Sequence, residues 1–493
     1  MVARAVVENR INSGPAKHSL NDNALLDAHR PPRQPPGGRF DGPQAVRWRH
    51  RIAAEGNTAE AYRDAKGQQG DRCRGARQQT GRAQEKSRPL AVKGSQSLHW
   101  SGSRRSHRGS NNNVLVRFVR PLGQRKTMSG LEQSWAAEFE LAVQCCKAAF
   151  RDAAPDPPAV PAGLNWQRFS RFTAFHRIEG FAAAFFAEPK SGAPTEVRSA
   201  LAEALARIAA RNLEVMAECQ ALRQSFERAG LPLLFLKGLT SGALAYRNPV
   251  TKTAIDIDLL IDPNDLRAAA GLLRECGYRL DVPRASPGNQ VLQKWHRSSK
   301  ESVWLNDARA IQLDLHTRVA DNSRLIPRIS VHSPRQVVDI GNGVQLPTLA
   351  PDELFAYLAV HGASSAWFRL KWISDFAGPL HGRNSAEVDR LYRRSQDLGA
   401  GRAAGQALLL ADRLFGSLEA NPELRRRLLD DPSTRRLCSI ALRLLSRKPA
   451  EPTEQLLGTL PHRMSQFLLL PGIGFRLGEL TDQVRRVFAN RSA

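Results

Sequence analysis

The sequence predicts an α+β fold in which a small mixed β-sheet lies between two helical regions. Apolar residues recur at three- to four-residue spacing from about residue 130 to 230 and again after residue 348, which is the period of amphipathic helices. Between these regions lie short aliphatic runs such as LPLLFLKG at 231–238 and AIDIDLLID at 254–262. Such runs, bounded by glycine or turn residues, are typical of buried strands.

Residues 1–127 differ in composition from the rest of the chain. They carry 25 of the 72 Lys and Arg residues but 9 of the 47 Asp and Glu residues, and so most of the net charge of +25. We expect this basic extension to be disordered, because its burial cannot offset the entropy of ordering it. We also expect it to be a mis-assigned upstream extension, since amphipathic helix begins just after Met128. A basic arm for nucleic acid or anionic lipid is the alternative.

The cysteines and the apolar runs indicate the compartment. The six cysteines form no CxxC pair and fit neither a zinc site nor a disulfide framework. No apolar run approaches the roughly 20 residues that a membrane span needs, and the N-terminus lacks a signal-peptide pattern. We expect a cytoplasmic protein with reduced thiols and no membrane association, and we expect no nucleic-acid partner on the strength of the charge alone.

The predicted elements follow one another in three blocks after the basic extension. Residues 128–230 form a helical region that ends where Gly230 and Pro232 stop the last helix. Residues 231–347 form an α/β core, and residues 348–493 form a C-terminal helical domain. The core is expected to contain, in order, a strand at 231–238, a helix at 241–246, a strand at 254–262, a helix at 263–278 and a strand at 310–319.

Two carboxylates interrupt the aliphatic strand at 254–262. Side chains alternate between the faces of a strand, so Asp256 and Asp258 project from one face and Ile257 and Leu259 from the other. A third carboxylate, Asp314, lies in the strand IQLDLHT. Like charges so close repel unless a cation neutralises them, so we expect substitution by Asn to maintain or raise stability. Mg²⁺ or Mn²⁺ fits such oxygen donors together with substrate phosphates.

The turn after the first strand carries Lys237 and Gly238. Glycine lets a backbone approach a phosphate closely, and Lys237 could add a positive charge there. The alternative is a plain turn with a solvated lysine.

These motifs together resemble a known family. The pattern LPLLFLKGLTSGALAY…DIDLLID…LDLH resembles the nucleotidyltransferases of the DNA polymerase β-like superfamily, and most of all an uncharacterised bacterial family with an L-K-G turn. The flanking segments WQRFSRFTAFHRIEGFAAAFF and HGASSAWFRLKWISDFA are similar to the helical motifs of that family. The resemblance covers roughly residues 135 to 480.

The resemblance implies roles for particular residues. Asp256 and Asp258 would bind two Mg²⁺ or Mn²⁺ ions, and Asp314 would bind the ion that activates the attacking group. Lys237 and Gly238 would lie along the phosphates of an NTP. Lys252 would also bind the nucleotide. Here the sequence departs from the family, because Lys252 replaces an Arg expected four residues before Asp256 and cannot form a bidentate fork on phosphate.

Further candidates have two interpretations each. His316 shares the face of Asp314 and either orients a phosphate or the third carboxylate, or is a plain hydrogen-bonded histidine. Lys371 and Asp375 form an i,i+4 pair, usually a surface salt bridge, on a helix that borders the cleft if the resemblance extends to it. Near one face of that helix we also place His361, Phe368 and Trp372. Residues expected to pack rather than to bind are Trp166, His176 and Tyr246.

The function implied by the resemblance is transfer of a nucleoside monophosphate from an NTP to an acceptor hydroxyl or phosphate, with release of pyrophosphate. A small molecule such as a sugar or an antibiotic fits the acceptor, and a protein or RNA acceptor stays open. The alternative is a non-catalytic scaffold or binding protein with the same fold.

The composition of residues 1–127 generates a first prediction. A chain that starts at Met128 should have the melting temperature and helix content of the full-length chain, because the segment cannot build a core. Circular dichroism during heating measures both. A large loss of stability would show that the basic extension packs on the body.

Overall fold

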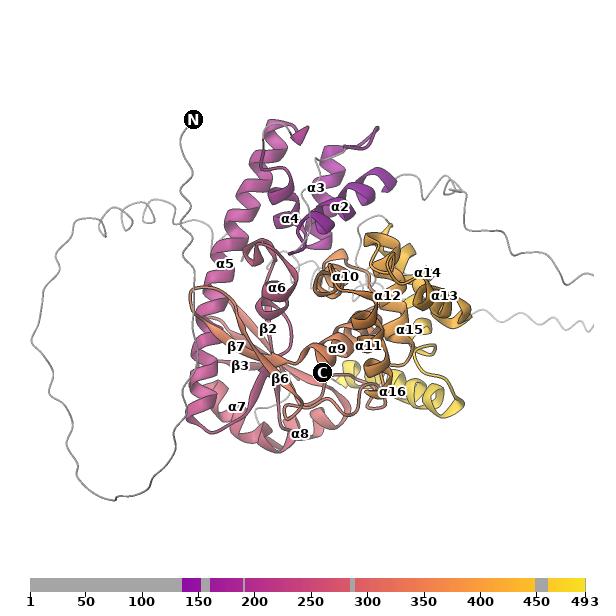
Figure 1. Cartoon of the computed structure of the whole chain (residues 1–493). Coiled ribbons are helices and arrows are strands. Elements are labelled where there is room, and N and C mark those ends of the chain that lie inside the picture. The colour runs from indigo at the N-terminus through magenta and orange to yellow at the C-terminus, as the bar shows by residue number, and fades with distance from the viewer. Residues whose placement is uncertain (1–134, 152–159, 189–190, 284–288, 448–459, 493) are drawn as a thin grey trace, which may run out of the picture. The chain divides into compact units, whose positions relative to one another are not determined.

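This computed structural model describes residues 135–151, 160–188, 191–283, 289–447 and 460–492 (Figure 1). The described residues belong to one unit of the chain. The expectations for residues 1–127 lie outside the described residues.

The predicted α+β class is confirmed, because the core is a five-stranded mixed sheet with the strand order β1-β2-β5-β4-β3. The strands are β1 (Leu233–Phe235), β2 (Asp256–Ile261), β3 (Arg279–Val282), β4 (Glu301–Asn306) and β5 (Ile311–His316). β2 and β5 pair in parallel, and the other neighbours are antiparallel. The parallel register sets Asp258 directly opposite Asp314.

The sheet holds two strands that the sequence did not predict. β3 is short, and β4 (ESVWLN) alternates half-buried and buried residues, so neither reads as an aliphatic run. A separate two-stranded sheet pairs β6 (Arg335–Asp339) with β7 (Gln345–Leu349).

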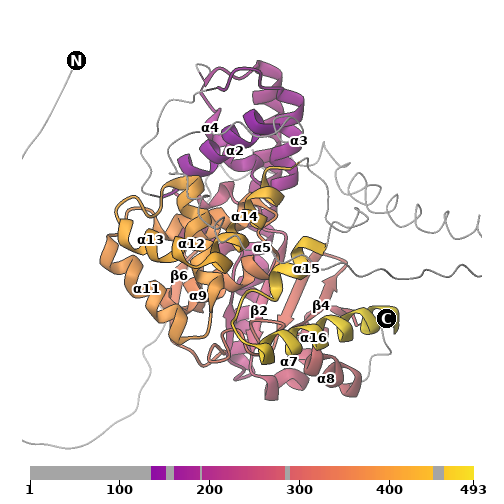
Figure 2. The same cartoon turned by 90° about the vertical axis from the view of Figure 1, so that its right-hand side faces the viewer.

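One face of the sheet is apolar and covered by helices. The 34-residue helix α5 (Thr195–Arg228) runs along the sheet in both views (Figures 1 and 2). It packs with α7 (Leu266–Glu275) on this face. The buried residues that meet there include Leu222, Phe226, Ile257, Leu259, Leu273, Trp304, Leu313 and Leu315. The alternation predicted for the strand at 254–262 is therefore confirmed on its apolar side.

A second core joins the helices that precede and follow the sheet, and Leu234, Leu236 and Leu260 contribute to it. Its N-terminal helices are α2 (Ala136–Ala148), α3 (Trp166–His176) and α4 (Glu179–Phe185). The helices after the sheet are α9 (Pro351–Ser364), α10 (Leu370–Ala377), α11 (Ser385–Asp397), α12 (Arg402–Phe415), α13 (Pro422–Asp430), α14 (Pro432–Leu445), α15 (Leu460–Gln466) and α16 (Ile473–Ser492). Shorter elements within the core are α6 (Leu239–Ala245), α8 (Asn289–Ser298), η3 (Pro249–Thr251), η4 (Pro263–Asp265) and η5 (Gly378–Leu380). None of the described helices is both long and apolar enough to cross a membrane.

The expectation of one helix carrying His361 and Trp372 is wrong. The helical conformation is interrupted between α9 and α10, where Ala366 and Trp367 take positive φ angles of 48° and 54°. The Trp367 ring folds back onto Gly362, where a Cβ atom would lie 2.2 Å from it. This local contact at the C-terminal end of the helix, together with the hydrogen bond from the amide of Trp367 to the carbonyl oxygen of Gly362, ends α9 in spite of its helical pattern.

The loop that enters β2 is fixed by a buried side chain of α5. Asn212 Nδ2 donates to the carbonyl oxygens of Val250 at 3.0 Å and Lys252 at 2.8 Å. Its Oδ1 accepts from the amide of Ala254 at 3.2 Å. Asn212 therefore sets the position at which β2, and with it Asp256, begins.

Removing this clamp should destabilise the protein. Asn212→Ala is expected to lower the free energy of unfolding by about 2–4 kcal/mol, because three backbone groups lose their partner. Urea denaturation measures the difference. The neighbouring Leu213→Ala, at a side chain that is 54% exposed, is the control and should change little. Equal effects of the two substitutions would contradict the assigned role of Asn212.

Candidate active site

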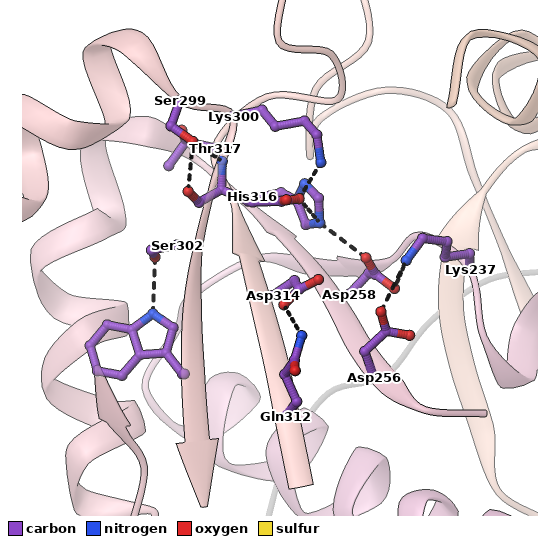
Figure 3. A network of polar contacts seen from close by, with 12 residues as sticks. Lys237, Asp256, Asp258, Ser299, Lys300, Ser302, Gln312, Asp314, His316 and Thr317 are labelled. Carbon is purple, nitrogen blue, oxygen red and sulfur yellow. Dashed lines mark hydrogen bonds and ion pairs between the residues drawn. The ribbon is translucent and has the colours of Figure 1, made fainter. Parts of the chain in front are cut away.

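The three predicted carboxylates lie together on the polar face of the sheet. Asp256 and Asp258 are two residues apart on β2, and Asp314 lies opposite Asp258 on β5. Asp258 and Asp314 are buried, whereas Asp256 is half-buried. Figure 3 shows the three side chains directed toward one region above the sheet.

Lys237 supplies the cation that this cluster requires. Its Nζ forms an ion pair with Asp258 and lies 3.8 Å from Asp256 Oδ2 (Figure 3). Burial lowers the pKa of Lys237, but Asp256 and Asp258 raise it by more, so that the pKa lies well above its ordinary value. The alternative of a solvated lysine is therefore wrong.

The turn that carries Lys237 requires glycine at the next position. Gly238 has a φ of 78°, which L side chains rarely adopt. This turn directs Lys237 from the end of β1 back toward β2.

The two facing carboxylates differ in their acidity. Burial raises the pKa of Asp258, but Lys237 and then His316 lower it by more, to well below its usual range. Burial and then the charge of Asp258 raise the pKa of Asp314 to about 7. Gln312 Nε2 donates to Asp314 Oδ1 at 3.0 Å. In the absence of a metal ion, Asp258 is thus a carboxylate at neutral pH, whereas Asp314 carries a proton in part of the molecules.

A charged network continues from Asp258 to β4. His316 Nε2 lies 3.1 Å from Asp258 Oδ1 and 3.2 Å from Glu301 Oε2. Lys300 forms an ion pair with Glu301. Burial raises the pKa of Glu301, but His316 and Lys300 lower it to about 2. His316 therefore contacts Asp258, the second carboxylate. One interpretation of the sequence had it orient Asp314, the third. Glu301 and Lys300 were missed because β4 was not predicted.

A cavity of about 320 Å³ opens over the carboxylates. Its walls come from the sheet, from the turn between α3 and α4, and from α9 and α10. Among the lining residues are Arg177, Lys237, Gly238, Lys252, Asp256, Asp258, Lys300, Glu301, Asp314, His361, Lys371, Trp372 and Asp375. The expectation that His361, Lys371, Trp372 and Asp375 border the cleft is confirmed, and Phe368 is not among the lining residues.

Lys252 lines the cavity but its charge is already matched. Its side chain is 2% exposed, and Nζ lies 3.3 Å from Asp375 Oδ2. The hydroxyl of Tyr246 donates to Asp375 Oδ1 at 2.7 Å, so Tyr246 is a core residue, as expected. A surface salt bridge between Lys371 and Asp375 was a wrong prediction, because both are buried and Asp375 pairs with Lys252.

Two further residues pack as expected. His176 is buried, and its Nδ1 accepts a hydrogen bond from the amide of Leu370. Trp166 packs edge-on against Phe169 and Phe186. Neither lines the cavity over the carboxylates.

The donor set fits a hard divalent cation. Asp258, Asp314 and His316 each offer a ligand atom, and these atoms lie within 4.8 Å of one another. The contact of Asp256 and Asp258 with a lysine ammonium shows that these oxygens require positive charge. Carboxylate oxygens are the donors that Mg²⁺ and Mn²⁺ prefer.

The fold and the cleft define an α+β protein with an acidic site on a small mixed sheet, whose donor atoms fit a metal ion. Residues 162–416 match the family described as uncharacterised nucleotidyltransferase, and the chain belongs to this family. The match runs from α3 to α12 and includes the whole five-stranded sheet. No curated protein matches the chain.

The unequal acidity of Asp258 and Asp314 generates a prediction about stability in the absence of metal. The folded-state pKa of Asp314 exceeds the unfolded value of about 4, so stability should fall as pH rises from about 4 to 7. Asp314→Asn should remove this fall and stabilise the protein at pH 8 by up to about 4 kcal/mol. Asp258→Asn should instead destabilise it by about 3 kcal/mol, because Lys237 loses its buried partner.

Urea denaturation in EDTA at pH 5 and pH 8 measures both effects. The sequence alone favoured relief of repulsion at each carboxylate, and the ion pair with Lys237 corrects this expectation for Asp258. Equal shifts of the two variants would contradict the assigned charges.

Proposed function

We propose that the protein transfers a nucleoside monophosphate from an NTP to an acceptor hydroxyl or phosphate and releases pyrophosphate, in the manner of the DNA polymerase β-like nucleotidyltransferases. The observation that supports this most is the row of three carboxylates on β2 and β5, which faces a cavity with lysines in its wall. Its occurrence in a chain of a nucleotidyltransferase family connects the site to this reaction.

Asp256, Asp258 and Asp314 are the residues that would hold two Mg²⁺ or Mn²⁺ ions. When bound, such ions neutralise charge on the reacting phosphate and activate the attacking oxygen. The proposal assigns the protein the task of fixing these oxygens. His316 orients Asp258 through Nε2, and Gln312 orients Asp314 through Nε2, which donates to Asp314 Oδ1.

Lys237 and Gly238 are proposed to face the phosphates of the nucleotide. Lys237 reaches the oxygens of Asp258 from the turn after β1, so its ammonium lies beside the place where the reacting phosphate must come. A Cβ atom at Gly238 would approach only the carbonyl oxygen of Asp256, at 3.7 Å. The requirement for glycine there is therefore its φ angle, which shapes the turn.

The acceptor is proposed to be a small molecule. A cavity of about 320 Å³ lies at the lower end of the usual range for small-molecule sites. Helices α9 and α10 contribute to its wall, which leaves little room for a nucleic-acid duplex. A cytoplasmic location, where NTPs and Mg²⁺ are present together, belongs to the same proposal.

The non-catalytic alternative explains the fold but not the charges. Asp258 and Asp314 are buried and Lys237 is half-buried on one face of the sheet. Burying such groups costs free energy even when they are paired, and a scaffold gains nothing from that cost.

The test is incubation of the purified protein with each labelled NTP, Mg²⁺ or Mn²⁺ and a metabolite extract. One NTP should transfer label to a product, with pyrophosphate released. Asp256→Asn and Asp258→Asn should each lower the rate by at least ~10²-fold, because a main electrostatic stabiliser of the transition state is lost. The exposed Asp430→Asn is the control and should retain full activity. Fully active, folded variants at Asp256 and Asp258 would contradict the mechanism.

A further inference from the structure

The cavity has a basic wall that the carboxylate cluster does not use. Lys371, at the start of α10, is 7% exposed and lines the cavity. Its Nζ donates to the carbonyl oxygen of Thr253 at 3.1 Å. Among the residues that the structure describes, no carboxylate lies within ion-pair distance of this ammonium. A lysine ammonium has three donors, so two of them are available to a ligand.

Arg177 adds a second cation to the same wall. It lies in the turn between α3 and α4 and lines the cavity. Within the described part of the chain, its guanidinium has neither a hydrogen bond nor an ion pair. The neighbouring Lys252 differs, because Asp375 matches its charge. The wall therefore carries two basic side chains whose charge no carboxylate of the described residues matches in an ion pair.

The charges that face Lys371 come from several elements. Burial, then the charge of Lys252 and, to a smaller extent, that of Arg177 together hold the pKa of Lys371 at about 7. Asp256 and Asp375 act in the opposite direction. A buried ammonium without a matched charge costs free energy, and an anion bound in the cavity would remove that cost.

The position of Lys371 indicates which anion this is. Lys371 Nζ donates to the carbonyl oxygen of Thr253, in the loop that leads into β2 and to Asp256, and the charge of Asp256 acts on it. Asp314, the predicted partner of the attacking group, lies one strand further away, on β5. An anion at Lys371 thus lies on the Asp256 side of the reacting phosphate, away from the acceptor.

We propose that Lys371 and Arg177 form a subsite for the β- and γ-phosphates of the nucleotide, the part that leaves as pyrophosphate. This subsite rests on the proposed function and extends it to residues from the helices before and after the sheet. Charge-assisted hydrogen bonds from an ammonium and a guanidinium are the usual protein contacts of phosphate oxygens.

Inorganic tripolyphosphate tests the subsite without knowledge of the base or the acceptor. Its affinity is measured by calorimetry, in EDTA and in Mg²⁺, for the full chain and its variants. Lys371→Met and Arg177→Gln should each weaken binding at least about tenfold, through loss of a charge-assisted contact. The exposed controls Lys147→Met and Arg171→Gln should bind like the parent.

Two measurements separate binding from folding. Lys371→Met should keep the parent's melting temperature or raise it, because a buried charge is removed, and Lys371→Arg should retain binding. The pH dependence should differ as well. As pH rises from 6 to 8.5, Lys371 loses its proton and the parent should lose affinity relative to Lys371→Arg, in which the charge persists.

Each outcome decides between the subsite and the function. If Lys371→Met and Arg177→Gln bind tripolyphosphate as tightly as the parent, and the parent transfers label, the subsite is overturned. The proposed nucleotidyl transfer then still stands. Equal weakening in the exposed controls, or no binding by the parent in either condition, also overturns the subsite. If tripolyphosphate binding weakens only in Lys371→Met and Arg177→Gln, and the parent transfers no label from any NTP, the result supports the subsite and contradicts nucleotidyl transfer.

Discussion

The parallel pairing of β2 with β5 determines where the charges of the site lie. Its register sets Asp258 opposite Asp314 and continues the alternation that turns Ile257 and Leu259 into the apolar core. A slip by one residue would exchange the two faces of a strand, and the carboxylates would enter the core under α5. Asn212 holds the start of β2 in place, so the geometry of the site depends on the helix that covers the opposite face.

The cavity separates its charges into two regions. The carboxylates of β2 and β5 gather negative charge over the sheet, and Lys237 neutralises only part of it. Lys371 and Arg177 leave positive charge on the wall formed by the flanking helices. A nucleotide with its divalent cations carries the complementary charges, because the cations are positive and the phosphate tail is negative. In the proposed complex, the sheet would hold the cations and the wall of flanking helices would hold the phosphates. The sheet alone would therefore make an incomplete site.

The sequence predicts those parts of the site that depend on local periodicity. The two-residue period of a strand places Asp256 and Asp258 on one face, and the aliphatic neighbours identify the other. β4 escapes prediction because Lys300, which precedes it, and Glu301, its first residue, interrupt the apolar pattern. Their position becomes visible only through pairing with β5.

One local contact and one contact between distant segments account for the rest of what the sequence does not show. Packing of Trp367 on Gly362 separates α9 from α10, although the residues on both sides have helical patterns. The pairing of Lys252 with Asp375 joins the entry to β2 to α10. Because Asp375 is engaged there, Lys371 has no carboxylate partner in an ion pair among the residues that the structure describes, although its i,i+4 spacing from Asp375 suggests one.

In the proposed function, the carboxylates held by β2 and β5 bind divalent cations in place of the Lys237 ammonium. Diffraction from crystals grown with Mn²⁺ and a non-hydrolysable NTP analogue measures this exchange. We expect anomalous peaks for manganese within coordination distance of Asp256, Asp258 and Asp314, with Lys237 Nζ moved from Asp258 to a phosphate oxygen. Nucleotide bound elsewhere, with no manganese at these carboxylates and Lys237 still paired with Asp258, would contradict it.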